Sequence, residues 1–319
     1  MREVSFEEIG AFLFGAVETE INEWGLSAHR FTANQRAIWS SLNDFMGGGA
    51  RCTTGVRLDF HTDADKARFT VGGEDLRDLG AEKNFKFEVL IDGLLSDCVI
   101  TQKGVVEVSL PTGEHRLTLA FPSHVRGYLR RMEISKGATL TPHVYKQKIL
   151  MLGDSITQGW HSRFDTLSYA WRTALALDAD LLCHGVGGSY FYPADFDGMD
   201  FAPDLITVAY GCNDYSTVQG EEELRKNMAA FLTPLFAAFP NTRKVGILPI
   251  PRLSQSGEKP LGTFANCRRI IKEEYAARNL EIIDGYELVP PLGELYTDHL
   301  HPNDIGFSLY AEQLLNQLQ

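Results

Sequence analysis

The chain lacks the cysteine pattern of a disulfide-stabilised protein. Its five cysteines are odd in number and are scattered over 319 residues without a CxxC pair. This distribution argues against a disulfide framework, in which an even number of cysteines is paired. We therefore expect reduced thiols and a cytoplasmic location. The cysteines are Cys52, Cys98, Cys183, Cys212 and Cys267.

Long apolar runs and an export signal are also missing. A membrane-spanning helix needs roughly 18 apolar residues, and no run approaches this length. The only apolar stretch near the start, residues 9–17, follows Glu7 and Glu8, whereas a secretory signal begins with a basic region. The sequence thus predicts a protein that is not exported and that has no membrane partner.

Positive charge is scarce relative to negative charge. The chain has 30 Lys and Arg against 42 Asp and Glu, which gives a formal net charge of -12 at pH 7. Such a charge repels phosphate backbones and anionic lipids, so it excludes nucleic acid as a partner and favours a neutral or cationic substrate. With 44% hydrophobic residues the chain can bury one or two cores, and typical domain lengths favour two. No oligomeric state is predicted.

In the first half, apolar and polar residues alternate from about residue 50 to 135, which predicts half-buried strands. We expect an antiparallel, jelly-roll-like β-sandwich over residues 1–142. Residues 12–24 fit either a strand or a helix, and residues 47–49, three glycines, are interpreted as a flexible break. Turns are expected at Gly72-Gly73, Asp92-Gly93 and Pro111-Thr112-Gly113.

After Pro142 the pattern changes to short apolar strands separated by helical stretches, which is typical of a parallel sheet covered on both faces. We place the boundary within residues 137–147, so that an α/β domain spans residues 143–319. The expected strands are 149–152, 181–183, 205–209, 244–248 and 280–283, and the clearest helices are 221–239, 263–278 and 305–318.

Chemically reactive residues follow several of these strands. In an open parallel sheet, ligands bind outside the carboxyl ends of the strands. We therefore expect the functional site among the segments that begin there. These segments are Gly153-Asp154-Ser155-Ile156-Thr157, Gly185-Val186-Gly187-Gly188, Gly211-Cys212-Asn213-Asp214 and Asp298-His299-Leu300-His301-Pro302-Asn303.

Taken together, the four segments resemble the SGNH (GDSL) hydrolase family in order and spacing, over roughly residues 148–319. The resemblance implies a three-layer, flavodoxin-like fold. It also implies Ser155 as nucleophile, Asp298 and His301 as the other triad members, and Gly188 and Asn213 as oxyanion donors beside the Ser155 N–H. Gly187, next to Gly188, is the alternative donor.

These roles also have a physical basis. A serine hydroxyl is a weak nucleophile that needs a base, and the imidazole of His301 titrates near neutrality. Asp298, three residues earlier, can orient that ring. His299 is the alternative base, while Ser189 lacks the G-x-S-x-G context of a nucleophile. For His161 and His184, a solvated or hydrogen-bonded histidine is favoured over substrate contact.

The resemblance extends to two-domain carbohydrate acetylesterases, which join an N-terminal β-sandwich to an SGNH domain. It implies hydrolysis of a short acyl ester, such as an O-acetylated carbohydrate, through an acyl-serine and without a metal or organic cofactor. Trp160 and Tyr190 are candidate substrate contacts, with core packing as the alternative. The alternative functions are another SGNH acylhydrolase (lipase or thioesterase), a metal-dependent phosphoesterase using Asp154, Asp214 and His299-x-His301, and a non-catalytic carbohydrate-binding protein.

Overall fold

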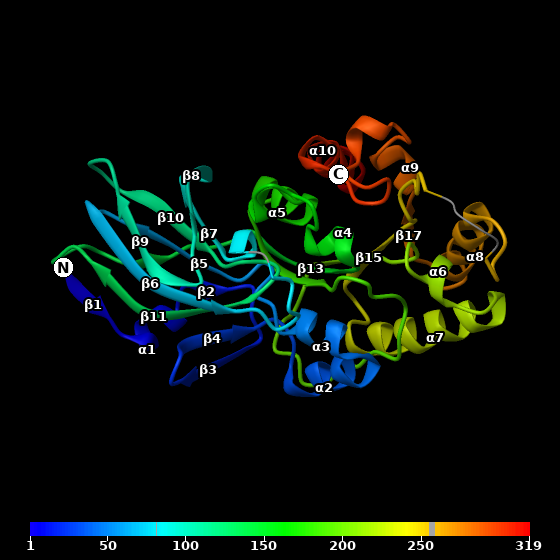
Figure 1. The fold of residues 1–319 in the computed structure, drawn as a ribbon, viewed down its shortest axis with the longest axis horizontal. Coiled ribbons are helices and arrows are strands. Elements are labelled where there is room, and N and C mark those ends of the chain that lie inside the picture. Colours follow the sequence, from blue (N-terminus) through cyan, green and yellow to red (C-terminus); the bar gives the residue numbers. More distant parts are fainter. Residues whose placement is uncertain (81, 255–258) are drawn as a thin grey trace.

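The computed structural model describes residues 1–80, 82–254 and 259–319. A β-rich half that contains the N-terminus and an α/β half that contains the C-terminus lie side by side along the long axis (Figure 1). This arrangement agrees with the change of hydrophobic pattern after Pro142.

Two antiparallel sheets form the β-rich half. One has the strands β1 (Arg2–Val4), β3 (Glu18–Asn22), β4 (Gly25–His29), β6 (Lys66–Glu74), β9 (Lys103–Ser109) and β11 (Arg126–Ile134), in the order β3-β4-β11-β6-β9 with β1 also on β11. The other has β2 (Leu13–Phe14), β5 (Arg57–Thr62), β7 (Lys86–Ile91), β8 (Leu94–Ile100), β10 (His115–Ala120) and β12 (Thr141–Pro142), in the order β12-β5-β10-β7-β8 with β2 also on β5. The alternating apolar residues of both sheets share one buried core, as the period-two pattern predicts.

The turns at Asp92-Gly93 and at 111–113 lie between strands, as predicted, but the turn predicted at Gly72-Gly73 is wrong. Both glycines lie inside β6 and are buried. A Cβ atom on Gly72 would lie 2.4 Å from the Tyr128 ring, and one on Gly73 would lie 2.7 Å from the Phe85 ring. The glycines therefore let aromatic rings pack directly on the strand, which is a use of glycine other than turn formation.

The α/β half has a parallel sheet in the order β14-β13-β15-β16-β17, which is the flavodoxin-like order expected. Its strands are β13 (Gln147–Gly153), β14 (Ala179–Gly185), β15 (Leu205–Ala209), β16 (Arg243–Ile247) and β17 (Glu281–Ile283). Each lies within two residues of the predicted strand.

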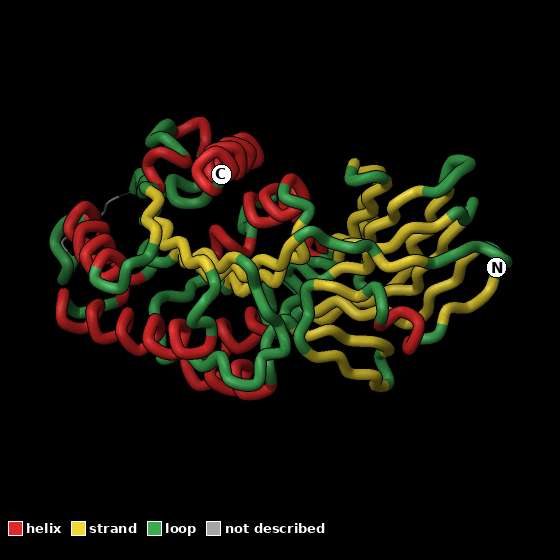
Figure 2. Tube along the Cα trace, turned by 180° about the vertical axis from the view of Figure 1, so that it is seen from behind, coloured by secondary structure: helices red, strands yellow, loops and turns green. Residues whose placement is uncertain are grey.

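Helices cover both faces of this sheet, as Figures 1 and 2 show, with α5 and α10 on one face and α7 on the other. The helices of this half are α4 (Ser155–Gln158), α5 (Tyr169–Ala176), α6 (Asp214–Thr217), α7 (Glu221–Ala238), α8 (Phe264–Ala276), α9 (Gly285–Leu288) and α10 (Asp304–Leu318). Short 3-10 helices occur at η2 (Asp165–Leu167) and η3 (Gly293–Leu295) in this half, and at η1 (Glu82–Asn84) in the β-rich half.

Helices also occur in the first fifty residues. They are α1 (Phe6–Gly10), α2 (Ala33–Leu42) and α3 (Asp44–Ala50). Trp39 of α2 and Met46 of α3 are buried in the core of the α/β half, although they belong to the 1–142 range expected for the β-sandwich. The domain boundary therefore stays a prediction, because two N-terminal helices contribute to the C-terminal core.

The flexible break expected at residues 47–49 is wrong, since the three glycines are buried within α3. A Cβ on Gly47 would lie 2.8 Å from Ser40 Oγ, and one on Gly48 would lie 2.7 Å from the Leu76 carbonyl oxygen. A Cβ on Gly49 would lie 3.1 Å from Val186. Glycine thus permits α3 to pack closely against three separate segments.

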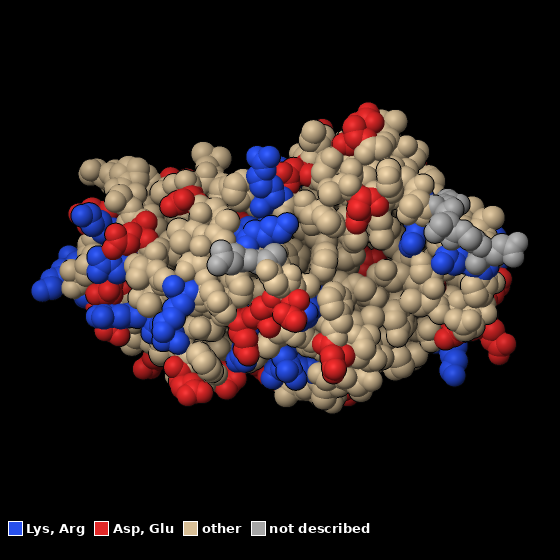
Figure 3. Space-filling view, viewed as in Figure 1, with Lys and Arg blue, Asp and Glu red and all other residues tan. Residues whose placement is uncertain are grey.

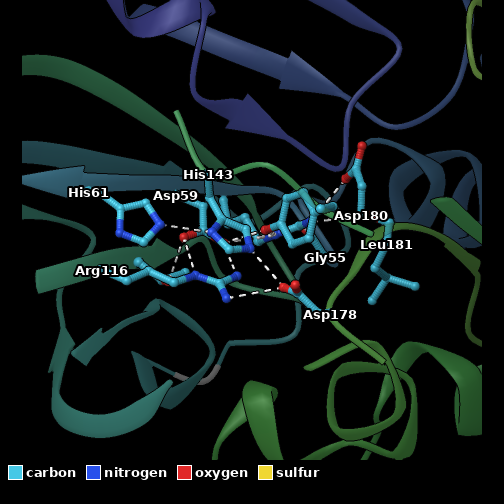
Figure 4. Close-up of polar contacts among 11 residues, drawn as sticks. Gly55, Asp59, His61, Arg116, His143, Asp178, Asp180 and Leu181 are labelled. Carbon is cyan, nitrogen blue, oxygen red and sulfur yellow. Dashed lines mark hydrogen bonds and ion pairs between the residues drawn. The ribbon is translucent and has the colours of Figure 1, made fainter. Parts of the chain in front are cut away.

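A buried cluster of charges joins the two halves (Figure 4). Asp59 accepts two hydrogen bonds from Arg116, at 2.7 and 2.9 Å, and one from Tyr145. The guanidinium of Arg57 donates to Asp180 of the α/β half at 2.9 Å. Burial alone would raise the pKa of Asp59, but the hydrogen bond from Arg116 and the charges of the two arginines hold it below its usual range.

The substitution Asp59→Asn should lower the free energy of unfolding by about 3 kcal/mol, because it leaves buried guanidinium charge with less compensation. Urea denaturation followed by circular dichroism measures the change. The exposed Asp200→Asn variant is the matched control and should unfold like the parent protein. Equal stability of the two variants would contradict a structural role for this cluster.

No helix in the described part of the chain is long and apolar enough to cross a membrane. All five cysteines are free thiols in the structure, and Cys52, Cys183, Cys212 and Cys267 are buried.

Candidate active site

The turn from β13 into α4 presents Ser155 at the edge of the parallel sheet. Asp154 is the N-cap of α4, and its carboxylate accepts the Ile156 N–H at 2.9 Å. A Cβ on Gly153 would lie 2.0 Å from Thr157 Oγ1, so only glycine fits at the end of this strand. Capping and close packing together place Ser155 as the first residue of α4.

Three side chains from distant parts of the sequence form a connected chain of hydrogen bonds. Ser155 Oγ lies 2.7 Å from His301 Nε2, and His301 Nδ1 lies 2.8 Å from Asp298 Oδ2. The other oxygen of Asp298 accepts the backbone N–H groups of Leu300 and His301, at 3.1 and 2.8 Å. The structure thus brings together a hydroxyl, an imidazole and a carboxylate in the geometry that a catalytic triad requires.

The environment sets the protonation states needed for this chemistry. Burial would raise the pKa of Asp298, but hydrogen bonds from the backbone and the ring of His301 lower it to about 2. Burial disfavours the imidazolium and lowers the pKa of His301 below its usual range, against the opposing effect of Asp298. At neutral pH the site therefore combines an ionised carboxylate with a neutral imidazole that can accept the Ser155 proton.

The loop after β14 distinguishes the two candidate glycine donors. The Gly187 N–H donates to the side-chain oxygen of Gln158 at 2.7 Å and is therefore occupied. Gly188 has a φ of +79°, and no hydrogen bond from its N–H is found among the described residues. Asn213 donates one amide hydrogen to the Ser189 carbonyl at 2.9 Å, which leaves its second amide hydrogen for a substrate oxygen.

Sequence reasoning missed Gln158, which connects the loop after β14 to the β-rich half. Its side-chain nitrogen donates to the Ser123 carbonyl at 2.9 Å, and its side-chain oxygen also accepts the Trp160 indole N–H at 3.0 Å. The only signal in the sequence was its position three residues after Ser155. Its partners are distant along the chain, so no motif could reveal them.

The remaining candidate residues lie in different environments. His184 is buried and its ring bonds to the Arg30 carbonyl, while Ser189 is buried and donates to the Gly153 carbonyl at 3.2 Å. His299 has a φ of +65°, and Tyr190 is half-buried against the core of the α/β half. Trp160 lies at the site, where its ring stacks on His301 with centroids 6.3 Å apart.

One group in the described residues has the spacing of a metal site, namely His161, Asp298 and His301. His161 Nε2 lies 3.4 Å from Asp298 Oδ2. Both ring nitrogens of His301 are already within hydrogen-bond distance of Ser155 and Asp298, so a metal at this place would have to displace the triad contacts. Asp154 and Asp214, the other carboxylates of the metal hypothesis, are both buried and each accepts a backbone N–H.

Comparison with known proteins finds a family profile that matches most of the α/β half. Residues 151–309 match the profile of the GDSL-like Lipase/Acylhydrolase family. No curated protein sequence matches the chain. Among solved structures, the salicylyl-acyltransferase SsfX3 from a tetracycline biosynthetic pathway superposes with a TM-score of 0.86 at 21% identity, covering 99% of this chain and 96% of that chain.

Carbohydrate esterases of family two have a similar fold. The enzyme from Cellvibrio japonicus gives a TM-score of 0.68 at 20% identity, covering 96% of this chain and 93% of that chain. The enzyme from Clostridium thermocellum, solved in complex with cellohexaose, gives 0.67 at 17% identity, with 84% and 92% covered. At these identities the similarity establishes the two-part fold that was expected from the sequence.

The pKa of His301 predicts the acid limb of the pH profile. A general base works only when unprotonated, so kcat/KM should be constant near pH 7 and fall tenfold per pH unit below the pKa of His301. Since that pKa lies below the ordinary 6.5, the decline should begin on the acid side of this value. Initial rates on p-nitrophenyl acetate, corrected for spontaneous hydrolysis, give the profile. An apparent pKa above 6.5 would contradict this assignment.

Proposed function

We propose that the chain is a serine esterase that removes a short acyl group, acetyl above all, from a carbohydrate hydroxyl. The match of residues 151–309 to the GDSL-like lipase/acylhydrolase family supports an ester-hydrolysing activity. The observation that carries this proposal is the chain of hydrogen bonds from Ser155 through His301 to Asp298. It connects a hydroxyl to the base that activates it.

In the proposed mechanism, His301 Nε2 takes the proton of Ser155 while Oγ attacks the ester carbonyl carbon. The carbonyl oxygen becomes an oxyanion that accepts hydrogen bonds from the N–H groups of Ser155 and Gly188 and from the Asn213 amide. The carbon–oxygen bond to the alcohol then breaks, and His301 returns the proton to the departing alkoxide. Water, activated by the same imidazole, hydrolyses the acyl-serine.

Two observations support a short acyl group on a sugar. Phe45 and Met46 lie beside Gly188, where a Cβ would be 3.8 and 3.9 Å from their side chains, so they limit the room next to the oxyanion loop. The half-buried ring of Trp160 offers an apolar face of the kind that packs against sugar rings. The two family-two carbohydrate esterases with a similar fold are consistent with this substrate class.

Substitution of the triad tests the mechanism. Ser155→Ala should lower kcat on p-nitrophenyl acetate by at least about a thousand-fold, because it removes the nucleophile. Asp298→Asn should lower kcat by about 10,000-fold, because the His301 ring would no longer be held in the required orientation and tautomer. EDTA should leave the rate of the parent protein unchanged. The exposed Ser216→Ala variant is the control for substitution at a serine. Full activity in Ser155→Ala, or its loss with EDTA, would overturn the mechanism.

Acyl-chain length tests the substrate proposal. The limited room beside Gly188 predicts that kcat/KM falls from p-nitrophenyl acetate to butyrate to octanoate, by at least about tenfold over the series. Spectrophotometric release of p-nitrophenol measures each value. A preference for octanoate would reject the short-acyl proposal and would favour a lipase-like or thioesterase-like acylhydrolase.

A further inference from the structure

A cavity of about 720 Å³ lies between the two halves of the molecule, and of its lining residues only Trp160 has a role in the function proposed above. Its volume is in the range of ligand-binding pockets, roughly 300–1,000 Å³, which often occur at domain interfaces. The β-rich half contributes Leu79, Lys83 and Ile100 to its lining, and the loop after α4 contributes Trp160, Arg163 and Phe164.

Two residues of the lining place the cavity on the histidine side of the triad. The Trp160 ring stacks on that of His301, and the His161 ring centroid lies 5.0 Å from it. In the acyl-transfer step, His301 must protonate the departing alkoxide, so the alcohol part of the ester has to lie next to this ring. In the proposed mechanism, the carbonyl oxygen of the ester instead faces Gly188 and Asn213. The position of the cavity therefore suits the alcohol part of the substrate.

The lining combines apolar surface with positive charge. Leu79, Ile100, Trp160 and Phe164 form apolar walls, and no Asp or Glu is among the described lining residues. Lys86 also lines the cavity, but its ammonium group pairs with the Asp165 carboxylate at 2.8 Å.

The two other cations of the lining are exposed. No ion pair of the Lys83 or Arg163 side chain is found in the described part of the chain. On the face drawn in Figure 3, both basic and acidic side chains lie where the two halves meet. In a chain with a net charge of -12, the described lining thus has two exposed cations and no acidic residue, and the nearby Asp304 carboxylate accepts the Arg163 backbone N–H at 2.8 Å.

We infer that this cavity binds the alcohol part of the ester, and that this alcohol carries a carboxylate on a ring with apolar faces. The inference rests on the proposed esterase function and specifies its substrate class. The ring packs on Trp160 while the carboxylate interacts with Lys83 and Arg163. The carboxylate takes no part in bond exchange: Ser155 Oγ gains the acyl group, and the alcohol leaves with the proton that His301 received from Ser155.

The test compares two esters that differ in one charge, 3-acetoxybenzoate and methyl 3-acetoxybenzoate. The selectivity is the kcat/KM for 3-acetoxybenzoate divided by that for its methyl ester. It should fall by about two- to five-fold in Arg163→Ala and in Lys83→Ala, because each variant loses one exposed charge contact to the carboxylate. It should also decline with added salt, since exposed charges are screened. Lys272→Ala, which removes an exposed cation from α8, should keep the parent selectivity.

The outcomes separate this inference from the proposed function. Equal selectivity in all four proteins, with hydrolysis of both esters intact, would overturn the charged subsite and leave the esterase function standing. Hydrolysis of neither ester would reject the esterase function itself. A second pair of esters, acetylated methyl glucuronide and acetylated methyl glucoside, has the same difference of charge on a sugar ring. A carboxylate preference in the sugar pair alone indicates a sugar acid, and a preference in the aryl pair alone indicates an aryl acid.

Discussion

The register of β13 between its two neighbours is the constraint on which the site depends. Gly153, the last residue of β13, is paired with Gly185 on one side and with Ala209 on the other. Because parallel strands in this register end at the same level, the segments that follow them leave the sheet together. Ser155, Gly188 and Asn213 lie in these three segments, so backbone pairing brings them to one edge before any side-chain contact contributes.

The β-rich half is part of this arrangement rather than an appended module. Gln158, three residues after Ser155, is held by the Ser123 carbonyl of the β-rich half and in turn holds the Gly187 N–H. Arg30, fully buried, donates to the Cys183 and Gly185 carbonyls at the end of β14. The loop after β14 is thus held by Arg30 directly and by Ser123 through Gln158. Removal of the N-terminal segment would leave these buried donors and acceptors unpaired.

Much of the fold could be predicted from the sequence because it depends on local patterns. Apolar runs bounded by glycine or acidic residues predicted the five parallel strands. The four motifs predicted the residues that meet at the carboxyl ends of these strands. The glycines were misread because their role depends on distant partners, such as Tyr128 against Gly72 and Ser40 against Gly47. Gln158 was missed for the same reason. The net charge predicted a neutral or cationic substrate, but the net charge of a whole chain does not determine the charge of the residues that line one cavity.

Buried charged side chains fix the geometry of the interface between the two halves. Apolar contacts impose little directional preference, whereas hydrogen bonds between charged groups have a preferred geometry. Arg57 donates across the interface to Asp180, and Arg116 donates to Asp59 beside it. On the side nearer the triad, Lys86 of β7 donates to Asp165, and Glu88 accepts the backbone N–H groups that begin η2. These contacts hold the 160–166 loop against the β-rich half, and the same loop carries Trp160 beside His301 and Arg163 at the cavity. The width of the cavity and the position of its aromatic wall therefore follow from polar contacts that lie outside the triad.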